Sequence, residues 1–309
     1  MTTHPSAIRA VELVEVGPRD GLQNEPGFVP TEQKVELVKR LIAAGVRRLE
    51  VASFVHPERV PQMADAEAVL AALPDRNDVA YIGLVLNKRG ALRALETRAH
   101  ELGTVCLTTD TFGKRNQGQT SDESLGVAME IVRLARDAGR RAQITISAAF
   151  GCPFEGEVDP ARVVEMAKRA ADAQPVEIAL ADTIGVAVPQ QVFELVTRVR
   201  EAIAPLPVRV HFHNTRNTGV ANVWAAVTAG AATVDASVGG IGGCPFAPRA
   251  TGNVPTEDVL YMLERSGVQT NVALDGVIAT AEWLSGVMGR TLPGMVSRAG
   301  PFPQARGNA

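Results

Sequence analysis

Eight short runs rich in β-branched residues recur along the chain, and an amphipathic stretch that could form a helix follows each of them. This alternation predicts parallel βαβ units, because a strand needs a long crossover connection before a parallel neighbour can pair with it. The starts of the runs are far enough apart for a strand, a loop and a helix each time. The expected strands are Val11–Val16, Arg48–Ala52, Val79–Leu86, Thr104–Thr108, Ala142–Ala148, Val176–Ala181, Val208–His213 and Thr233–Val238.

Eight such units in 309 residues favour a closed (β/α)8 barrel, the TIM barrel, over an open doubly wound sheet. A dinucleotide-binding sheet would carry Gly-x-Gly-x-x-Gly after its first strand, whereas this chain has Gly17-Pro18-Arg19-Asp20-Gly21 there. We therefore expect one α/β domain over residues 1–309. It would comprise a barrel over about residues 10–250, a lid and a C-terminal helical extension over about 239–290 with helices near Thr256–Arg265 and Gly276–Met288, and a frayed tail over 293–309.

Glycines placed shortly before four of the expected strands indicate where helices end. They are Gly45, Gly103, Gly139 and Gly230, and each follows a helical stretch. Glycine is favoured just after a helix because it adopts the left-handed backbone conformation without steric cost. We expect all four to cap helices.

The charge pattern favours a small ligand over a polyanionic partner. The formal net charge is -3, and the basic residues are scattered, which argues against nucleic acid or an anionic membrane as the main partner. No apolar run reaches the roughly 20 residues of a membrane span, and the first residues lack a signal peptide's apolar stretch, so we expect a cytoplasmic protein. The three cysteines, Cys106, Cys152 and Cys244, form no CxxC pair, which argues against a disulfide framework or a structural zinc site.

Two histidines stand at the end of the seventh expected strand. If this segment is extended, His211 and His213 point to one side while Val210 and Phe212 point to the other. Neutral imidazole is the commonest protein metal ligand, so the pair suggests a metal site. Two core histidines hydrogen-bonded to their neighbours would give the same pattern.

Acidic residues gather at the ends of other strands, where a TIM barrel has its active site. Asp20 follows the first strand, Glu50 lies in the second, Asp182 closes the sixth and Asp235 lies within the eighth. Each acid alone could be a helix N-cap or the partner of a buried arginine. Their convergence on one barrel mouth favours a functional site.

Asp20, the two histidines and the amide oxygen of Asn253 would form a mixed nitrogen and oxygen ligand set. Such a set suits a divalent metal that keeps open positions for water or substrate, and it leaves magnesium, manganese and zinc as alternatives. The glycine-rich segment Gly239–Ala247 is typical of a mobile lid, with a phosphate cradle as the second interpretation. Cys244 would move with this lid, although a small buried side chain or an idle thiol is the plainer interpretation.

Several motifs together resemble the 3-hydroxy-3-methylglutaryl-CoA (HMG-CoA) lyase family, over about residues 10–290. The likeness is specific because it needs all of them, and the first also separates these lyases from related acyl-CoA condensing enzymes. The motifs are Glu15–Glu25 (EVGPRDGLQNE), His211-x-His213, Gly242–Ala247 (GGCPFA), Gly252-Asn253, Thr256–Leu263 (TEDVLYML), Gly151–Gly156 (GCPFEG) and Asp182–Val186 (DTIGV).

The resemblance implies a TIM-barrel lyase that binds one Mg²⁺ or Mn²⁺ through Asp20, His211, His213 and Asn253. The family reaction cleaves a tertiary 3-hydroxyacyl-CoA to acetyl-CoA and an oxo acid; for HMG-CoA the acid is acetoacetate, a step of leucine degradation. The expected partner is thus a small acyl-CoA, and we expect a homo-oligomer, a dimer or a tetramer.

Chemistry assigns roles that agree with this reaction. Arg19 would receive the negative charge that gathers on the thioester oxygen, and Asp20 would accept or relay the hydroxyl proton. Glu50 and Asp182 would hold Arg19 or the metal waters in place. Cys244 would protonate the acetyl-CoA enolate, because a thiol with a pKa of about 8.5 is still protonated at neutral pH. The expected substrate contacts are Gln23, Asn214 and Arg216.

The chain departs from the family pattern near the expected pocket. After His213 it has Asn214 and Arg216 where the family usually has Asp and Tyr, and the sixth strand carries Ala179 and Ala181 where the family has Ser and Gly. We expect the chemistry to survive while the acceptor half of the substrate differs, with Arg216 binding a carboxylate or another polar group. Citramalyl-CoA and a longer branched 3-hydroxyglutaryl-CoA are alternative substrates; a condensing transferase and a non-catalytic metal-binding scaffold are alternative functions.

Overall fold

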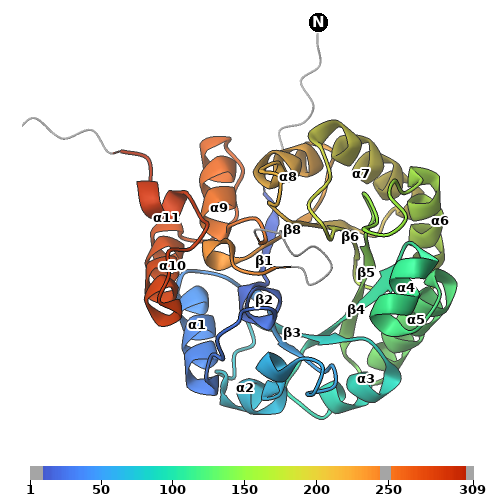
Figure 1. Ribbon diagram of the computed structural model, residues 1–309, viewed down its shortest axis with the longest axis horizontal. Coiled ribbons are helices and arrows are strands. Elements are labelled where there is room, and N and C mark those ends of the chain that lie inside the picture. The colour runs from blue at the N-terminus through green and yellow to red at the C-terminus, as the bar shows by residue number, and fades with distance from the viewer. Residues whose placement is uncertain (1–9, 244–251, 304–309) are drawn as a thin grey trace, which may run out of the picture.

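A computed structural model describes residues 10–243 and 252–303 of the chain. Eight parallel strands form one closed barrel in sequence order, with β8 pairing back to β1. A ring of helices surrounds the strands (Figure 1). The predicted TIM barrel is therefore confirmed. The strands are β1 Glu12–Glu15, β2 Arg48–Ser53, β3 Ala80–Val85, β4 Glu101–Leu107, β5 Arg141–Ser147, β6 Ile178–Asp182, β7 Val208–Phe212 and β8 Thr233–Ala236.

Crossover helices follow the strands, and three further helices follow the barrel. The helices of the ring are α1 Thr31–Ala43, α2 Ala66–Ala72, α3 Lys88–Leu95, α4 Asp110–Gln117, α5 Ser121–Asp137, α6 Pro160–Ala171, α7 Pro189–Ile203 and α8 Gly219–Thr228. The extension comprises α9 Thr256–Arg265, α10 Leu274–Met288 and α11 Val296–Ala299, and short helical turns are η1 Gly17–Gly21, η2 Pro61–Met63 and η3 Val238–Gly240.

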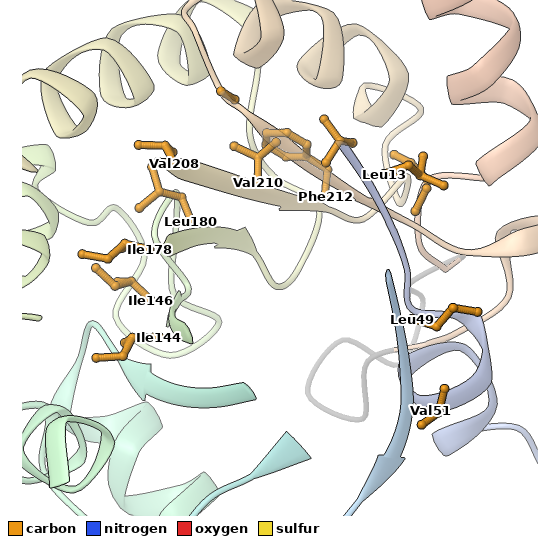
Figure 2. Packing of buried hydrophobic residues seen from close by; sticks show 14 of the residues in the cluster. Leu13, Leu49, Val51, Ile144, Ile146, Ile178, Leu180, Val208, Val210 and Phe212 are labelled. Atoms are coloured by element: carbon orange, nitrogen blue, oxygen red, sulfur yellow. The ribbon is translucent and has the colours of Figure 1, made fainter. Parts of the chain in front are cut away.

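The main hydrophobic core is the layer between the strands and the helices. Along β7, Val208, Val210 and Phe212 belong to this core, and Figure 2 shows them on the side of the strand that faces the helices, as it does for the labelled residues of β5 and β6. Because side chains alternate along a strand, Arg209 and His211 lie on the opposite face, inside the barrel. The same alternation that builds the core thus delivers polar side chains to the barrel interior.

Three of the four expected glycine caps are confirmed. Gly45, Gly139 and Gly230 have positive φ angles just after α1, α5 and α8. The prediction for Gly103 was wrong, because this residue lies inside β4, which begins at Glu101. A Cβ atom at Gly103 would lie 2.9 Å from Nε2 of Gln143 on β5, so strand pairing and a close approach explain the glycine.

The C-terminal extension packs on the barrel through α9 and α10. The helix predicted at Thr256–Arg265 has those bounds, whereas α10 begins at Leu274, two residues before the prediction. The tail, expected to fray from Pro293, instead forms α11, and the backbone N–H groups of Met295 and Val296 donate to Asp258. Residues 304–309 lie outside the described residues. Among the helices of the described ranges, none is long and apolar enough to cross a membrane.

Candidate active site

The candidate site lies at the carboxyl ends of the strands, as expected for a TIM barrel. Asp20 comes from η1 after β1, His211 from β7, and His213 follows β7. One potential ligand atom of each lies within 4.8 Å of the others. The sequence therefore predicted correctly that these three residues converge.

Asn253 completes this cluster. It forms an isolated bridge with His213, and its Nδ2 donates to Oδ2 of Asp20 at 2.9 Å. Its Oδ1 is buried and has no hydrogen-bond partner among the described residues, and the same holds for Nδ1 of His213. Buried polar atoms are normally satisfied, so two orphaned acceptors beside a carboxylate and a second imidazole fit a divalent cation.

The electrostatics of the cluster also suit a cation. Burial would raise the pKa of Asp20, but the charge of Arg19 above all, with the neighbouring His211 and a hydrogen bond from Asn253, holds that pKa well below its ordinary value, so the carboxylate is ionised. Burial, together with the neighbouring His211, lowers the pKa of His213 to about 4. The neutral imidazole of His213 and the ionised carboxylate of Asp20 can each offer an electron pair to a metal.

Arg19 lies between two carboxylates beside this cluster. Its Nε donates to Glu50, and its Nη1 donates to Oδ1 of Asp20 at 2.7 Å. Burial disfavours the guanidinium, but Glu50 and Asp20 raise the pKa of Arg19, so it remains charged. The turn η1 can hold Arg19 and Asp20 here because Gly21 allows a close approach: a Cβ atom there would lie 2.7 Å from Ile241.

A pocket opens beside the cluster and is lined by side chains of two kinds. The charged and imidazole side chains of Arg19, Asp20, His211 and His213 form one set, and the second set is apolar: Leu84, Leu86, Val105, Leu107 and Phe112. The hydroxyls of Thr145, Ser147 and Thr183 also line it. Gln23 is a further lining residue, and its Oε1 is buried without a partner in the described part of the chain. The pocket can therefore bind a ligand that has both polar groups and an apolar part.

Four other predicted site residues remain. Asp182, Asn214 and Arg216 do not line the pocket among the described residues, and Cys244 lies outside the described residues. Both carboxylate oxygens of Asp182 accept backbone N–H groups of its own loop, from Val186 and Ala187. Asn214 likewise accepts from the backbone of Gly219, and Arg216 donates from Nη1 to the carbonyl of Gly185 at 2.8 Å.

None of these three residues is among those that line the pocket within residues 10–243 and 252–303. Cys244 and the rest of the predicted lid from residue 244 to 247 lie outside the described residues, whereas Gly243 lines the pocket.

Two buried residues of the site, Arg209 and Asp235, had no predicted role. Arg209 was not singled out, and Asp235 was noted only as an acid within a strand, yet both line the pocket. The signal was available, because Arg209 shares the period-two face of His211. Glu15 was predicted only as part of a family motif, without a role. It is fully buried and accepts the N–H groups of Gly17 and Val238.

Comparisons with known proteins agree with this geometry. A family model described as HMGL-like matches residues 10–284. The chain is 44% identical to (R)-citramalyl-CoA lyase of Chloroflexus aurantiacus, over 96% of this chain and 97% of that one. It is 36% identical to hydroxymethylglutaryl-CoA lyase YngG of Bacillus subtilis, over 92% and 95%. A solved HMG-CoA lyase from Acinetobacter baumannii, in complex with coenzyme A and 3-methylmalate, superposes with a TM-score of 0.92 at 37% identity, covering 99% of this chain and 100% of that one.

Proposed function

Because the chain belongs to the HMGL-like family and is an enzyme of the HMG-CoA lyase type, we propose that it cleaves a tertiary 3-hydroxyacyl-CoA to acetyl-CoA and a 2- or 3-oxo acid. One Mg²⁺ or Mn²⁺ would be held by Asp20, His211, His213 and Asn253. The observation that carries the proposal is the convergence of these four side chains beside Arg19 at the pocket.

When bound, the cation would lower the pKa of the substrate's hydroxyl group and fix the position of its oxygen. Asp20 would accept the proton of that hydroxyl. The oxygen then forms a C=O bond, and the bond between the second and third carbons of the acyl group breaks. The electron pair of the broken bond is delocalised into the thioester, which becomes an enolate. The enolate oxygen accepts hydrogen bonds from the N–H groups of Arg19.

The enolate then needs a proton on its terminal carbon to become acetyl-CoA. Cys244 would supply it, as the residue after the pocket-lining Gly243. Glu50 would keep the guanidinium of Arg19 in place, since Nε of Arg19 donates to it. The apolar wall would keep water away from the enolate, and the unpartnered Oε1 of Gln23 would accept a hydrogen bond from the substrate.

Among possible substrates we favour (R)-citramalyl-CoA over HMG-CoA. The relative that carries the former name is 44% identical to this chain, against 36% for a relative that carries the latter. Ala181 lines the pocket at a position where glycine is expected in HMG-CoA lyases, so its methyl group would leave less room for the substrate. Citramalyl-CoA is one methylene shorter than HMG-CoA, and one methylene discriminates by about 10- to 200-fold in such pockets.

The test is to incubate the purified chain with both CoA esters and identify the products by mass. We expect acetyl-CoA and pyruvate from citramalyl-CoA, with a kcat/KM at least about tenfold above that for HMG-CoA, and Ala181→Gly should reduce the difference. A chelator should abolish turnover, and Mn²⁺ should restore it. Higher activity on HMG-CoA would refute only the substrate choice; no acetyl-CoA from either ester would refute the lyase.

Two controls extend this experiment. A condensing transferase would instead release free CoA from acetyl-CoA and an oxo acid, so that assay separates the alternative function. Arg216→Ala tests whether Arg216 binds the substrate: an unchanged preference would remove it from the substrate contacts. The expected homodimer or homotetramer and the cytoplasmic location stay predictions, and light scattering on the purified protein tests the first.

A further inference from the structure

His211 has a carboxylate on each side of its ring. Its Nε2 lies 3.9 Å from Oδ2 of Asp20, so this nitrogen faces the proposed metal site. Its Nδ1 lies 3.1 Å from Oδ2 of Asp235. The pairing of β7 with β8 places His211 beside Asp235, because Val210 pairs with Val234 one residue earlier. A neutral imidazole in this setting can donate its Nδ1–H to Asp235 in a hydrogen bond and keep the lone pair of Nε2 free.

Asp235 is itself held from its other side. Nε of Arg209 donates to Oδ1 of Asp235 at 2.5 Å. Arg209 is only 1% exposed, and it lies on the same face of β7 as His211, two residues earlier. Each oxygen of Asp235 therefore has its own donor position, and the carboxylate cannot rotate without losing one of them.

The support continues down the barrel interior. Nη1 of Arg209 lies 3.4 Å from Glu177, and Nη2 of Arg48 donates to the same oxygen of Glu177 at 2.6 Å. Arg48 also pairs with the buried Glu101. These five buried residues comprise three carboxylates and two guanidiniums, and the exposed Arg141 also pairs with Glu101. Buried charges are costly unless they are compensated, and each carboxylate of the series has at least one guanidinium partner. Asp235, at the end of the series, lies nearest to the site that we assign to a cation.

We propose that Asp235, fixed by Arg209, is a positioning residue for the metal ligand His211. It accepts the Nδ1–H of His211, thereby selects the tautomer whose Nε2 lone pair faces Asp20, and does so before any metal is bound. The proposal rests on the metal-dependent function proposed above. His213 differs, since its Nδ1 has no hydrogen-bond partner in the ranges that the structure describes.

The first test is Mn²⁺ affinity, measured by isothermal titration calorimetry on Asp235→Asn. An amide has one oxygen, so it can serve either Arg209 or His211, and its NH₂ group then faces the other. We expect Mn²⁺ to bind about 10- to 100-fold more weakly, the usual effect of removing such an outer carboxylate. The matched control is Glu101→Gln, a carboxylate of the same buried series whose described contacts are to Arg48 and Arg141. Its affinity should stay within about threefold of the unmodified chain.

The second test uses the metal-free protein, first as the unmodified chain and then as Asp235→Asn. Long-range ¹⁵N–¹H NMR at alkaline pH distinguishes the two neutral tautomers of each histidine. We expect His211 to carry its proton on Nδ1 in the unmodified chain and to shift toward the Nε2–H form in Asp235→Asn.

An Nε2–H tautomer in the unmodified chain, or unchanged Mn²⁺ affinity in a folded Asp235→Asn, would overturn the proposal. Should the unmodified chain bind no Mn²⁺, the metal-dependent function fails instead, and the NMR result still reports the role of Asp235.

Discussion

Arg19 is the residue on which the proposed chemistry depends most. It is charged, nearly buried and held between Glu50 and Asp20, so its donors are already oriented when the substrate arrives. Such preorganised donors act on charge that develops in the transition state, and losing one typically costs about 10²- to 10³-fold in kcat. We therefore predict that Arg19→Gln lowers kcat by at least about 10²-fold while Mn²⁺ affinity stays within about threefold.

The control is Arg290→Gln, which removes a half-exposed arginine that pairs with Glu25 and does not line the pocket. Steady-state kinetics on both variants, with calorimetry for the metal, measures the two effects. Turnover of Arg19→Gln close to that of the unmodified chain would show that the charge is stabilised by another group.

For single residues, the sequence predicted correctly which side chains meet when strand geometry alone brings them together. Asp20, His211 and His213 follow from parallel strands that end at one edge. Asp182 also closes a strand, but its side chain turns back to the N–H groups of its own loop, and no strand pattern predicts a loop's path. The interaction of Asp235 with Arg209 and His211 depends on the register of β7 against β8, which a single sequence does not specify.

Glu15 connects four elements around the site. Its Oε1 accepts N–H groups from η1 and η3, and its Oε2 accepts the hydroxyl of Thr256 at the start of α9. Burial raises the pKa of Glu15 from 4.5 to about 8, so it is largely protonated at neutral pH. The folded state therefore binds more protons than the unfolded state between these values, and the free energy of unfolding falls as pH rises from about 4.5 to about 8.

We predict that Glu15→Gln flattens this dependence, because a neutral amide can still accept the two N–H groups at Oε1 and donate from Nε2 to the hydroxyl of Thr256 at any pH. The slope attributable to one such group is at most about 1.4 kcal/mol per pH unit. Urea denaturation at several pH values between 5 and 8 measures it, roughly spanning the interval in which the two states differ in protonation. Glu36→Gln, on the exposed face of α1, is the matched control. Equal slopes in both variants would contradict the prediction.

The elements themselves were largely predictable, and the exceptions have physical causes. α9 was predicted with its bounds because an acidic first turn precedes an apolar periodic stretch. β4 begins three residues before Thr104, the predicted start, because Glu101, Leu102 and Gly103 also pair with β3 and β5. A glycine inside a strand and a glycine after a helix look alike in one sequence, and for Gly103 its strand partners and the close approach of Gln143 distinguish them.

In the whole molecule, the apolar core that stabilises the fold and the polar residues of the site occupy different regions. The main apolar core lies outside the strands, while much of the barrel interior consists of paired charges and the site above them. The alternation of strands and helices predicted the closed barrel because each strand must cover one face with helices. That a network of buried ion pairs fills the interior could not be predicted, because it requires knowing which strands are neighbours around the ring.

The central claim is that one divalent cation binds beside Arg19 and is held by side chains from η1, from the end of β7 and from the segment before α9. A crystal structure of the chain with Mn²⁺, with anomalous diffraction recorded at the manganese edge, tests this directly. The account predicts one anomalous peak within about 2.0 to 2.3 Å of Asp20, His211 and His213, with Oδ1 of Asn253 turned toward it. A protein fully loaded by calorimetry whose peak lies away from these residues, or whose imidazoles face away from Asp20, would contradict it.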